Sequence, residues 1–120
     1  MTPDQLRACC LEQNGAWEDR PFPANPGLSA FKVGAKVFAF SGLDEVPLRV
    51  SLKCEPEIAV RLRASTPAVR PGVHLDKRHW NTVELDGSLP DRTVREMVED
   101  SYDLVVAGLP RRERLRLGRD

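Results

Sequence analysis

The sequence predicts an α+β domain, a two-layer fold in which helices pack on a mainly antiparallel five-stranded sheet. Two observations predict it. Segments with strand-like alternation of apolar and polar residues come in hairpin-like groups, and segments with helical three- and four-residue spacing begin, divide and end the chain. The expected order is α-β-β-β-α-β-β-α, which lacks the regular strand–helix alternation of a parallel α/β sheet.

The first helix is expected to begin at Thr2, because the Thr2 side chain can cap the free N–H groups of a first turn. Pro3 suits the first helical position, and Gln5 completes a capping box with Thr2. Gly15 ends the helix, since glycine is common directly after a helical segment. The sequence therefore predicts a short, well-capped helix at the start of the domain.

An irregular segment is expected over residues 16–27, which contain three prolines. Trp17 and Phe22 lie within it. Two large aromatic side chains in a segment without regular structure are expected to lie over the core as apolar cover.

Three antiparallel strands in a row are expected next. Residues 28–33 and 36–43 flank a two-residue turn in which Gly34 supplies the positive φ that a tight hairpin requires. Residues 47–53 follow, and three apolar residues alternate with three polar ones there. That alternation predicts a half-buried strand with one solvent-exposed, basic face.

A second helix is expected over residues 55–64, with Ile58 and Leu62 on its buried stripe. Acidic residues open it and arginines close it, as the helix dipole favours. Two short strands, 72–76 and 81–87, are then expected around a basic turn. They would form a second hairpin beside the first three strands.

The longest helix is expected after Pro90 and ends at Gly108. Its apolar residues recur at three- and four-residue spacing, which predicts one clear core face. The residues on that face are Val94, Met97, Val98, Ser101, Tyr102 and Val105.

Charge is distributed unevenly although the formal net charge is zero. Residues 1–110 carry 13 Lys and Arg against 16 Asp and Glu, whereas residues 111–120 carry five Arg against two acids. The sequence therefore predicts a single domain over 1–110 followed by a basic tail over 111–120, and a frayed, solvated tail is favoured over a phosphate-binding one. The balance also argues against a strongly electropositive nucleic-acid binder.

A cytoplasmic location is expected. The chain has no apolar run of the ~20 residues that a membrane span needs, and its first residues lack the layout of a secretory signal. The odd number of cysteines fits a reducing compartment, and the adjacent Cys9 and Cys10 are poor disulfide partners that are expected to be buried in the first helix.

Residues 71–85, "PGVHLDKRHWNTVEL", hold both histidines and one of the two tryptophans. A metal site on His74 and His79 is disfavoured because a spacing of five places them on opposite faces of a strand. An acid–base site on Glu84 and Asp86 is disfavoured because carboxylates on an exposed strand face are usually solvated. No catalytic motif or cofactor-binding glycine loop occurs, so neither an enzyme nor a cofactor is expected.

Contact with nucleic acid is the third interpretation of the same stretch. Its cations suit phosphates, its tryptophan can stack on a base, and its asparagine can contact a base edge. Two further cations from the polar face of the strand 47–53 extend the patch. The candidate residues are Lys77, Arg78, His79, Trp80 and Asn81, flanked by Arg49 and Lys53.

The chain also resembles a known family. The segments "FKVGAKVFAF", "RVSLKCEPEIAVRLRA", "VRPGVHLDKRHWNTVELDGSLPD" and "SYDLVVAGLP" are similar to those of the MmcQ/YjbR family of small bacterial proteins, over residues 2 to 110. The resemblance implies an α+β fold like that of secretion chaperones or double-wing DNA-binding proteins, and it implies DNA binding. Asp76 departs from the family pattern, which often has Asn there, and puts an acid beside two cations.

The best function from the sequence is therefore weak DNA binding, mainly through phosphates. The first alternative is a protein-interaction module of the secretion-chaperone type, with a protein partner or a homodimer. The second is an enzyme or metal protein that uses His74 and His79.

Overall fold

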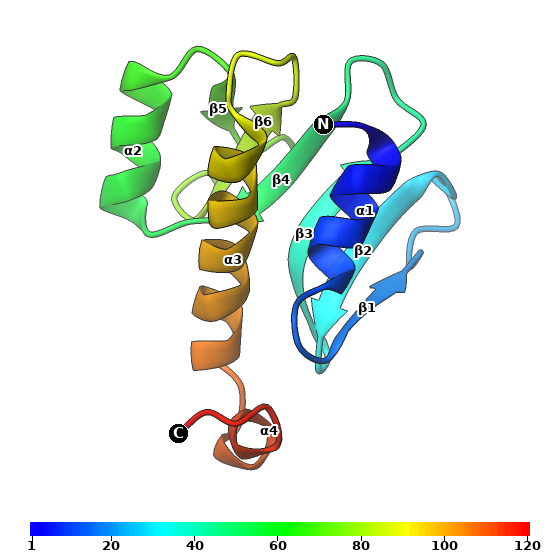
Figure 1. The fold of residues 1–120 in the computed structure, drawn as a ribbon, viewed down its shortest axis with the longest axis vertical. Coiled ribbons are helices and arrows are strands. Elements are labelled where there is room, and N and C mark those ends of the chain that lie inside the picture. Colours follow the sequence, from blue (N-terminus) through cyan, green and yellow to red (C-terminus); the bar gives the residue numbers. More distant parts are fainter.

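The structure, a computed structural model, describes residues 1–120 as a six-stranded sheet whose one face is covered by helices α1, α2 and α3 (Figure 1). The helices are α1 (Pro3–Leu11), α2 (Pro56–Ser65), α3 (Asp91–Ala107) and α4 (Arg111–Arg116). The strands are β1 (Ala16–Asp19), β2 (Leu28–Val33), β3 (Lys36–Gly42), β4 (Arg49–Lys53), β5 (Val69–Pro71) and β6 (Trp80–Glu84). Their order in the sheet is β1-β2-β3-β4-β6-β5, and every neighbouring pair is antiparallel.

The predicted α+β class with helices on an antiparallel sheet is confirmed, and several elements match in detail. Thr2 and Gln5 form the capping box at the start of α1. Gly34 has φ +59 in the two-residue turn between β2 and β3. These features depend on residues close together in the sequence, which is why the sequence could predict them.

The expected count of five strands and three helices is wrong, because the sheet has a sixth strand at its edge. All three prolines of the segment 16–27 come after Asp19, so residues 16–19 keep the N–H groups that pairing needs. They pair with β2 from Ala16 opposite Val33 to Asp19 opposite Ala30. Trp17 lies on this strand with 44% of its surface exposed and does not cover the core as predicted.

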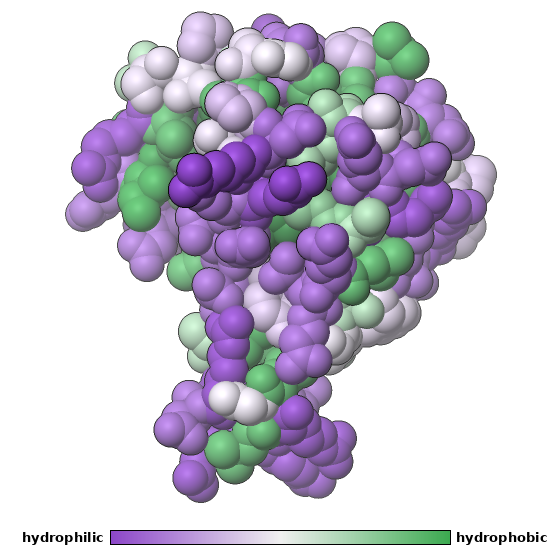
Figure 2. Space-filling model, viewed as in Figure 1, coloured by the Kyte–Doolittle hydropathy of each residue, from purple (hydrophilic) through white to green (hydrophobic).

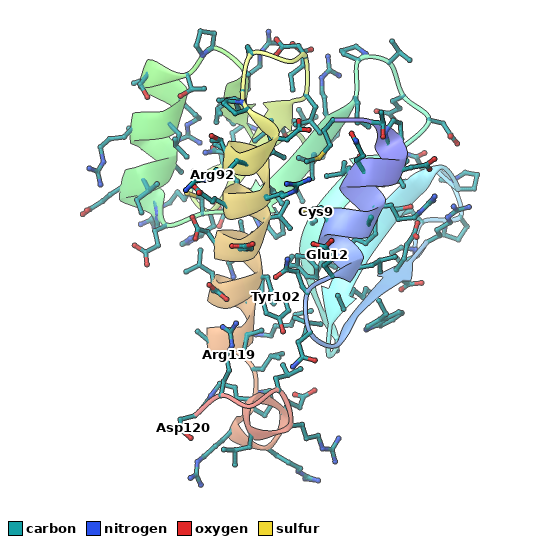
Figure 3. All side chains as sticks on the ribbon, viewed as in Figure 1. Cys9, Glu12, Arg92, Tyr102, Arg119 and Asp120 are labelled. Carbon is teal, nitrogen blue, oxygen red and sulfur yellow. The ribbon has the colours of Figure 1, made fainter.

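The tail forms helix α4 rather than a frayed terminus. Leu117 packs against the core cluster, and its carbonyl accepts a hydrogen bond from the Asn14 side chain. Arg119 reaches back to α3, where its guanidinium pairs with Asp103 at 2.8 Å and lies 5.3 Å from the centre of the Tyr102 ring (Figure 3). The basic charge of the tail is thus carried on a docked segment.

The second hairpin differs from the expected one. The strand predicted over residues 72–76 is shifted to Val69–Pro71, and residues 72–79 form a loop in which His74 has φ +58. A positive φ is the left-handed region that a strand residue does not adopt. The following strand begins at Trp80, a residue that the sequence predicts to lie in the turn.

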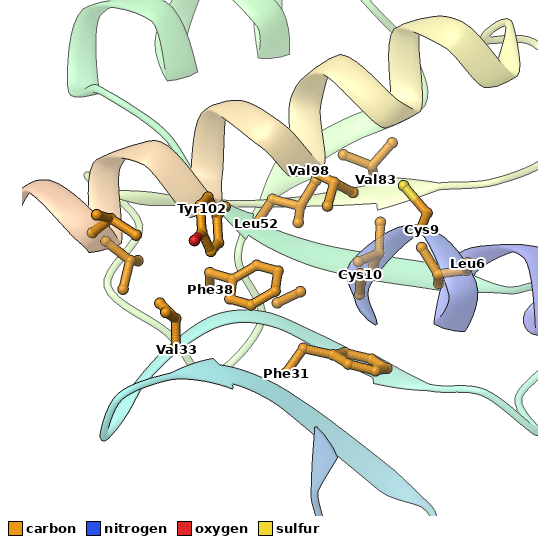
Figure 4. Close-up of a cluster of buried hydrophobic side chains, with 14 of the residues drawn as sticks. Leu6, Cys9, Cys10, Phe31, Val33, Phe38, Leu52, Val83, Val98 and Tyr102 are labelled. Carbon is orange, nitrogen blue, oxygen red and sulfur yellow. The ribbon is translucent and has the colours of Figure 1, made fainter. Parts of the chain in front are cut away.

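The core lies between the helices and the sheet (Figure 4). The predicted face of α3 is buried apart from the half-buried Met97, whereas Ile58 of α2 is 42% exposed against expectation, because Ala59 faces the sheet in its place. The main buried residues are Leu6, Cys9, Cys10, Phe31, Val33, Phe38, Val50, Leu52, Val83, Val98, Tyr102 and Val105.

The view in Figure 2 shows the helix-covered side, where polar residues dominate the surface. None of the helices is long and apolar enough to cross a membrane. The opposite side of the sheet, called here the helix-free face, carries the side chains that alternate with the buried ones.

Candidate nucleic-acid interface

The pairing of β4 with β6 places several predicted site residues on the helix-free face. Lys53 lies opposite Trp80, and Arg49 lies opposite Glu84. Directly opposed residues of an antiparallel pair project from the same face. Because Val50 and Leu52 between them are buried, Arg49, Lys53 and Trp80 project away from the helices.

Lys77 and Arg78 lie at the tip of the loop 72–79, and both are exposed. The loop is fixed by its own hydrogen bonds: the backbone N–H of Gly72 donates to the carbonyl of Trp80, and the backbone N–H of Trp80 donates to the carbonyl of Asp76. The two cations therefore project from an ordered turn directly before strand β6.

Asp76, the acid beside these cations, is engaged locally. One carboxylate oxygen accepts a hydrogen bond from the backbone N–H of Arg78 at 3.0 Å, and the other lies 3.8 Å from Nε2 of His79. It makes no ion pair with the side chain of Lys77 or Arg78. The acid therefore shapes the turn and leaves both positive charges free.

Four cations, two on the helix-free face and two on the loop 72–79, have no carboxylate oxygen within 4.0 Å. One is Arg70, which lies opposite Thr82 on the helix-free face. Lys77 is linked to the same edge, since its Nζ donates to the carbonyl of Gly72 at 3.4 Å. We call Lys53, Arg70, Lys77 and Arg78 the basic cluster. Arg49 is not a member, because its Nη2 lies 3.6 Å from Oε1 of Glu84 and the two side chains form an ion pair.

Asn81 does not belong to this surface. It lies opposite Leu52 on the helix-covered face and is 3% exposed. Its amide nitrogen donates to the carbonyl of Ala59, and its amide oxygen accepts from Nη1 of Arg63. The predicted base-edge contact is therefore wrong for Asn81, whose amide joins α2 to β6.

Aromatic rings continue the surface from the basic cluster across the sheet. The ring centres of Trp80 and Phe40 are 5.5 Å apart, and those of Phe40 and Phe22 are 6.1 Å apart. Phe22 is 40% exposed, and the other two rings are half-buried. These three rings form an aromatic row on the helix-free face.

A groove of about 370 Å³ lies beside this row. The segment that contains Phe22 and the loop that contains His74 line it on either side, and Phe40, Ser51 and Thr82 form its floor. Arg49 also lines it. The groove is large enough for one small ligand.

The carboxylates and thiol nearby have separate surroundings. Asp86 accepts hydrogen bonds from Ser88, which lower the pKa of its carboxyl, while Glu84 pairs with Arg49. Burial raises the pKa of the Cys54 thiol.

No group of three or more His, Cys, Asp or Glu side chains could hold a metal ion. His74 lines the groove and His79 contacts Asp76, so the two histidines have different neighbours.

The sequence missed Arg63, Arg70, Phe22 and Phe40 as candidate residues. Arg70 lies between the predicted helix 55–64 and the predicted strand 72–76, and its position is set only by pairing with β6. Phe40 and Phe22 are brought together by tertiary packing across 18 residues of sequence. Only the alternation in β3, which puts Phe40 on the face opposite the buried Ala39, was a signal that sequence could have used.

The sequence matches the YjbR family model over residues 11–104. It is 38% identical to the "uncharacterized protein YjbR" of Escherichia coli (strain K12) over 116 residues, which cover 95% of each chain. It is 33% identical to the "uncharacterized protein YbdF" of Escherichia coli O157:H7, and this alignment covers 80% of this chain and 79% of that one.

Solved structures share the fold. The crystal structure of Deinococcus radiodurans protein DR2400, with the domain DUF419, has a TM-score of 0.89 and 38% identity, with 99% of this chain and 89% of that chain covered. A crystal structure of a Pseudomonas syringae protein has a TM-score of 0.75 and 26% identity, with 87% and 98% covered. Since the family model covers most of the sequence and the relatives align over nearly its full length, the chain belongs to the YjbR family.

Proposed function

We propose that this protein binds DNA weakly, mainly through phosphates, with the basic cluster as the contact surface. The observation that supports it is the concentration of four cations without ion-pair partners around Trp80 in a chain whose total charge is zero. Unpaired cations release the counterions of the phosphate backbone when they bind, and this release supplies most of non-specific affinity.

Each member of the cluster has a distinct position. Lys77 and Arg78 stand on the exposed turn, Lys53 lies beside Trp80 on the sheet, and Arg70 lies at the edge strand β5. Phosphate contacts made from a turn and two strands fix the orientation of a backbone but do not read sequence. The function is therefore non-specific binding, to which His79 and Arg49 add flanking contacts.

The salt dependence of binding to a labelled DNA duplex tests this proposal. Four phosphate contacts predict a log–log slope of about −3 to −4, and K77A/R78A is expected to reduce it to about −2. The matched control is R111A/R112A, which removes the same charge from exposed positions on α4. The proposal fails if wild-type protein shows no binding at low salt, or if the control flattens the slope as much as K77A/R78A does.

A further inference from the structure

We infer that the groove on the helix-free face receives one unpaired nucleobase, so that the protein binds single-stranded DNA in preference to duplex. This inference rests on the proposed function, which supplies the phosphate contacts. It adds that the DNA bound is single-stranded. It is carried by the groove's shape, its unused hydrogen-bonding groups and its connection to the basic cluster.

Aromatic side chains give the groove the surface that a base requires. Phe22 stands on one side with 40% exposure, and Phe40 forms the floor 6.1 Å away, centre to centre. The remaining apolar lining of the groove comes from Leu28, Val73 and Leu75. Planar bases stack on exposed aromatic rings regardless of sequence, which suits a non-specific site. The volume of about 370 Å³ is sufficient for one small ligand such as a base.

Polar groups in the groove remain available to a ligand. The hydroxyls of Ser51 and Thr82 lie 2.9 Å apart, and Thr82 Oγ1 also accepts from the backbone N–H of Val73. The hydroxyl pair shares one hydrogen bond, which uses one of its two O–H hydrogens, and no protein acceptor takes the other. Asn25 and Glu45 at the rim add an amide and a free carboxylate. A base edge presents both donors and acceptors, which this set can match.

The groove lining offers one cation, Arg49, to the phosphate attached to such a base, beside one carboxylate, Glu45. Arg49 lines the groove, and its pairing with Glu84 at 3.6 Å engages one nitrogen of a guanidinium that has five N–H donors. His74 lines the same groove from the loop 72–79. The phosphate attached to a base in the groove would therefore lie within reach of Arg49.

The aromatic row connects the groove to the basic cluster. Trp80 contacts Phe40 at the floor and lies opposite Lys53 of the cluster. A strand whose phosphates follow the cluster therefore passes Trp80 on its way to the groove. In a duplex the bases are already paired and stacked, and extruding one costs a few kcal/mol. Single-stranded DNA has no such cost.

Binding of a labelled single-stranded oligonucleotide of about eight nucleotides, compared with a hairpin duplex, tests the inference. Phe22→Ala is expected to weaken single-strand binding about 5- to 150-fold and to leave duplex binding unchanged. Trp17→Ala is the matched control, because Trp17 is a similarly exposed aromatic on the outer strand β1. Thr82→Val removes the hydroxyl without changing the shape of the side chain, and it is expected to weaken single-strand binding more than duplex binding, since the hydroxyl also accepts from the backbone N–H of Val73.

The two proposals fail in different ways. If K77A/R78A weakens both forms of DNA while Phe22→Ala changes neither, the groove inference is wrong and the proposed function stands. Salt-independent binding, or no binding of either form, overturns both. A free nucleotide such as dTMP is expected to compete only at concentrations far above those of the oligonucleotide. Equal affinity for the free nucleotide would assign the groove to small nucleotides and overturn the single-strand inference.

Discussion

Arg63 and Lys77 are joined by a hydrogen bond in which Nη1 of the arginine donates to the lysine carbonyl at 2.7 Å. The same nitrogen also donates to the buried amide oxygen of Asn81 at 3.2 Å. One guanidinium on α2 therefore holds both the loop that carries the basic cluster and the strand that follows it. The position of the exposed cations depends on a helix from another part of the chain.

Arg63→Ala is expected to destabilise the protein by about 1–3 kcal/mol, because it leaves the amide oxygen of Asn81 without its charged donor. Urea unfolding measures the loss, and hydrogen exchange is expected to quicken at the amides of residues 72–79. Arg61→Ala is the control. Arg61 is exposed on the same helix and makes no ion pair, so a change within about 0.5 kcal/mol is expected. Equal effects of the two substitutions would show that Arg63 does not support the loop.

Ser101→Ala is expected to cost about 1–3 kcal/mol in free energy of unfolding. The Ser101 hydroxyl, fully buried on α3, donates to the carbonyl of Phe38 at 2.6 Å and accepts from the backbone N–H of Lys53 at 2.8 Å. These two backbone groups continue the β3–β4 ladder past the pair Ala39–Leu52, at the point where the strands separate. Removing the hydroxyl leaves both groups without partners inside the protein.

Chemical denaturation of Ser101→Ala beside Ser65→Ala provides the comparison. Ser65 donates to the carbonyl of Arg61 on the exposed surface of α2, where water can replace it. The second substitution is expected to change stability by less than about 0.5 kcal/mol. A Ser101→Ala variant as stable as Ser65→Ala would mean that the ladder does not need the hydroxyl.

Elements that are determined by neighbouring residues can be predicted from the sequence, and elements that depend on distant partners cannot. The hairpin turn at Gly34 and the buried face of α3 follow from neighbouring residues and were predicted correctly. Helix α4 and strand β1 were missed, because each is stabilised by partners far away in the sequence, such as Asn14 for the carbonyl of Leu117.

The candidate site shows the same division. Residue types identified Lys77, Arg78 and Trp80, but they could not tell on which face of β6 each residue projects. Asn81 pairs with the buried Leu52 of β4, and its side-chain amide donates a hydrogen bond to the carbonyl of Ala59, so it projects toward the core. Pairing register decides the face of a strand from which a residue projects, and residue types alone do not reveal it. The groove was invisible to the sequence because its walls come from separate segments.

Glu18→Gln is expected to destabilise the protein at pH 7 by about 1.5–3 kcal/mol. Glu18 is 19% exposed, accepts from Ser29 Oγ and pairs with Arg7 Nε at 3.0 Å. Burial opposes its ionisation, but the hydrogen bonds from Ser29 and Arg7 outweigh burial and lower its pKa below the ordinary value of 4.5. The ionised form is therefore the stabilising one.

The sign of the pH dependence follows from that lowered pKa. The contribution of Glu18 is complete above its unfolded pKa and is lost as the pH falls through the folded pKa. Unfolding measured between pH 7 and pH 3 is expected to show the gap between wild type and Glu18→Gln closing at acid pH. Glu12→Gln, at an exposed residue without an ion pair, is expected to follow wild type throughout. A gap that stays constant with pH would contradict the role of the charge.

Leu117→Ala is expected to lower stability by about 1–2 kcal/mol, because the leucine covers part of the core at the end of α4. Arg119→Gln removes the pair with Asp103 and is expected to cost less, since both side chains are about half exposed. Thermal unfolding measures both changes, and Arg116→Gln, exposed on the same helix and without an ion pair, serves as control. A frayed tail would instead make all three substitutions silent.

Neither tail substitution should change the salt slope of DNA binding. Helix α4 lies at the lower end of the molecule in Figure 1, apart from strands β5 and β6, which lie in the upper half. Screening confines the influence of exposed charges to about 8–10 Å at ordinary salt concentrations, so Arg119 should not reach a phosphate bound at the basic cluster. If Arg119→Gln lowered the slope as K77A/R78A is expected to do, the contact surface would have to be moved to the tail.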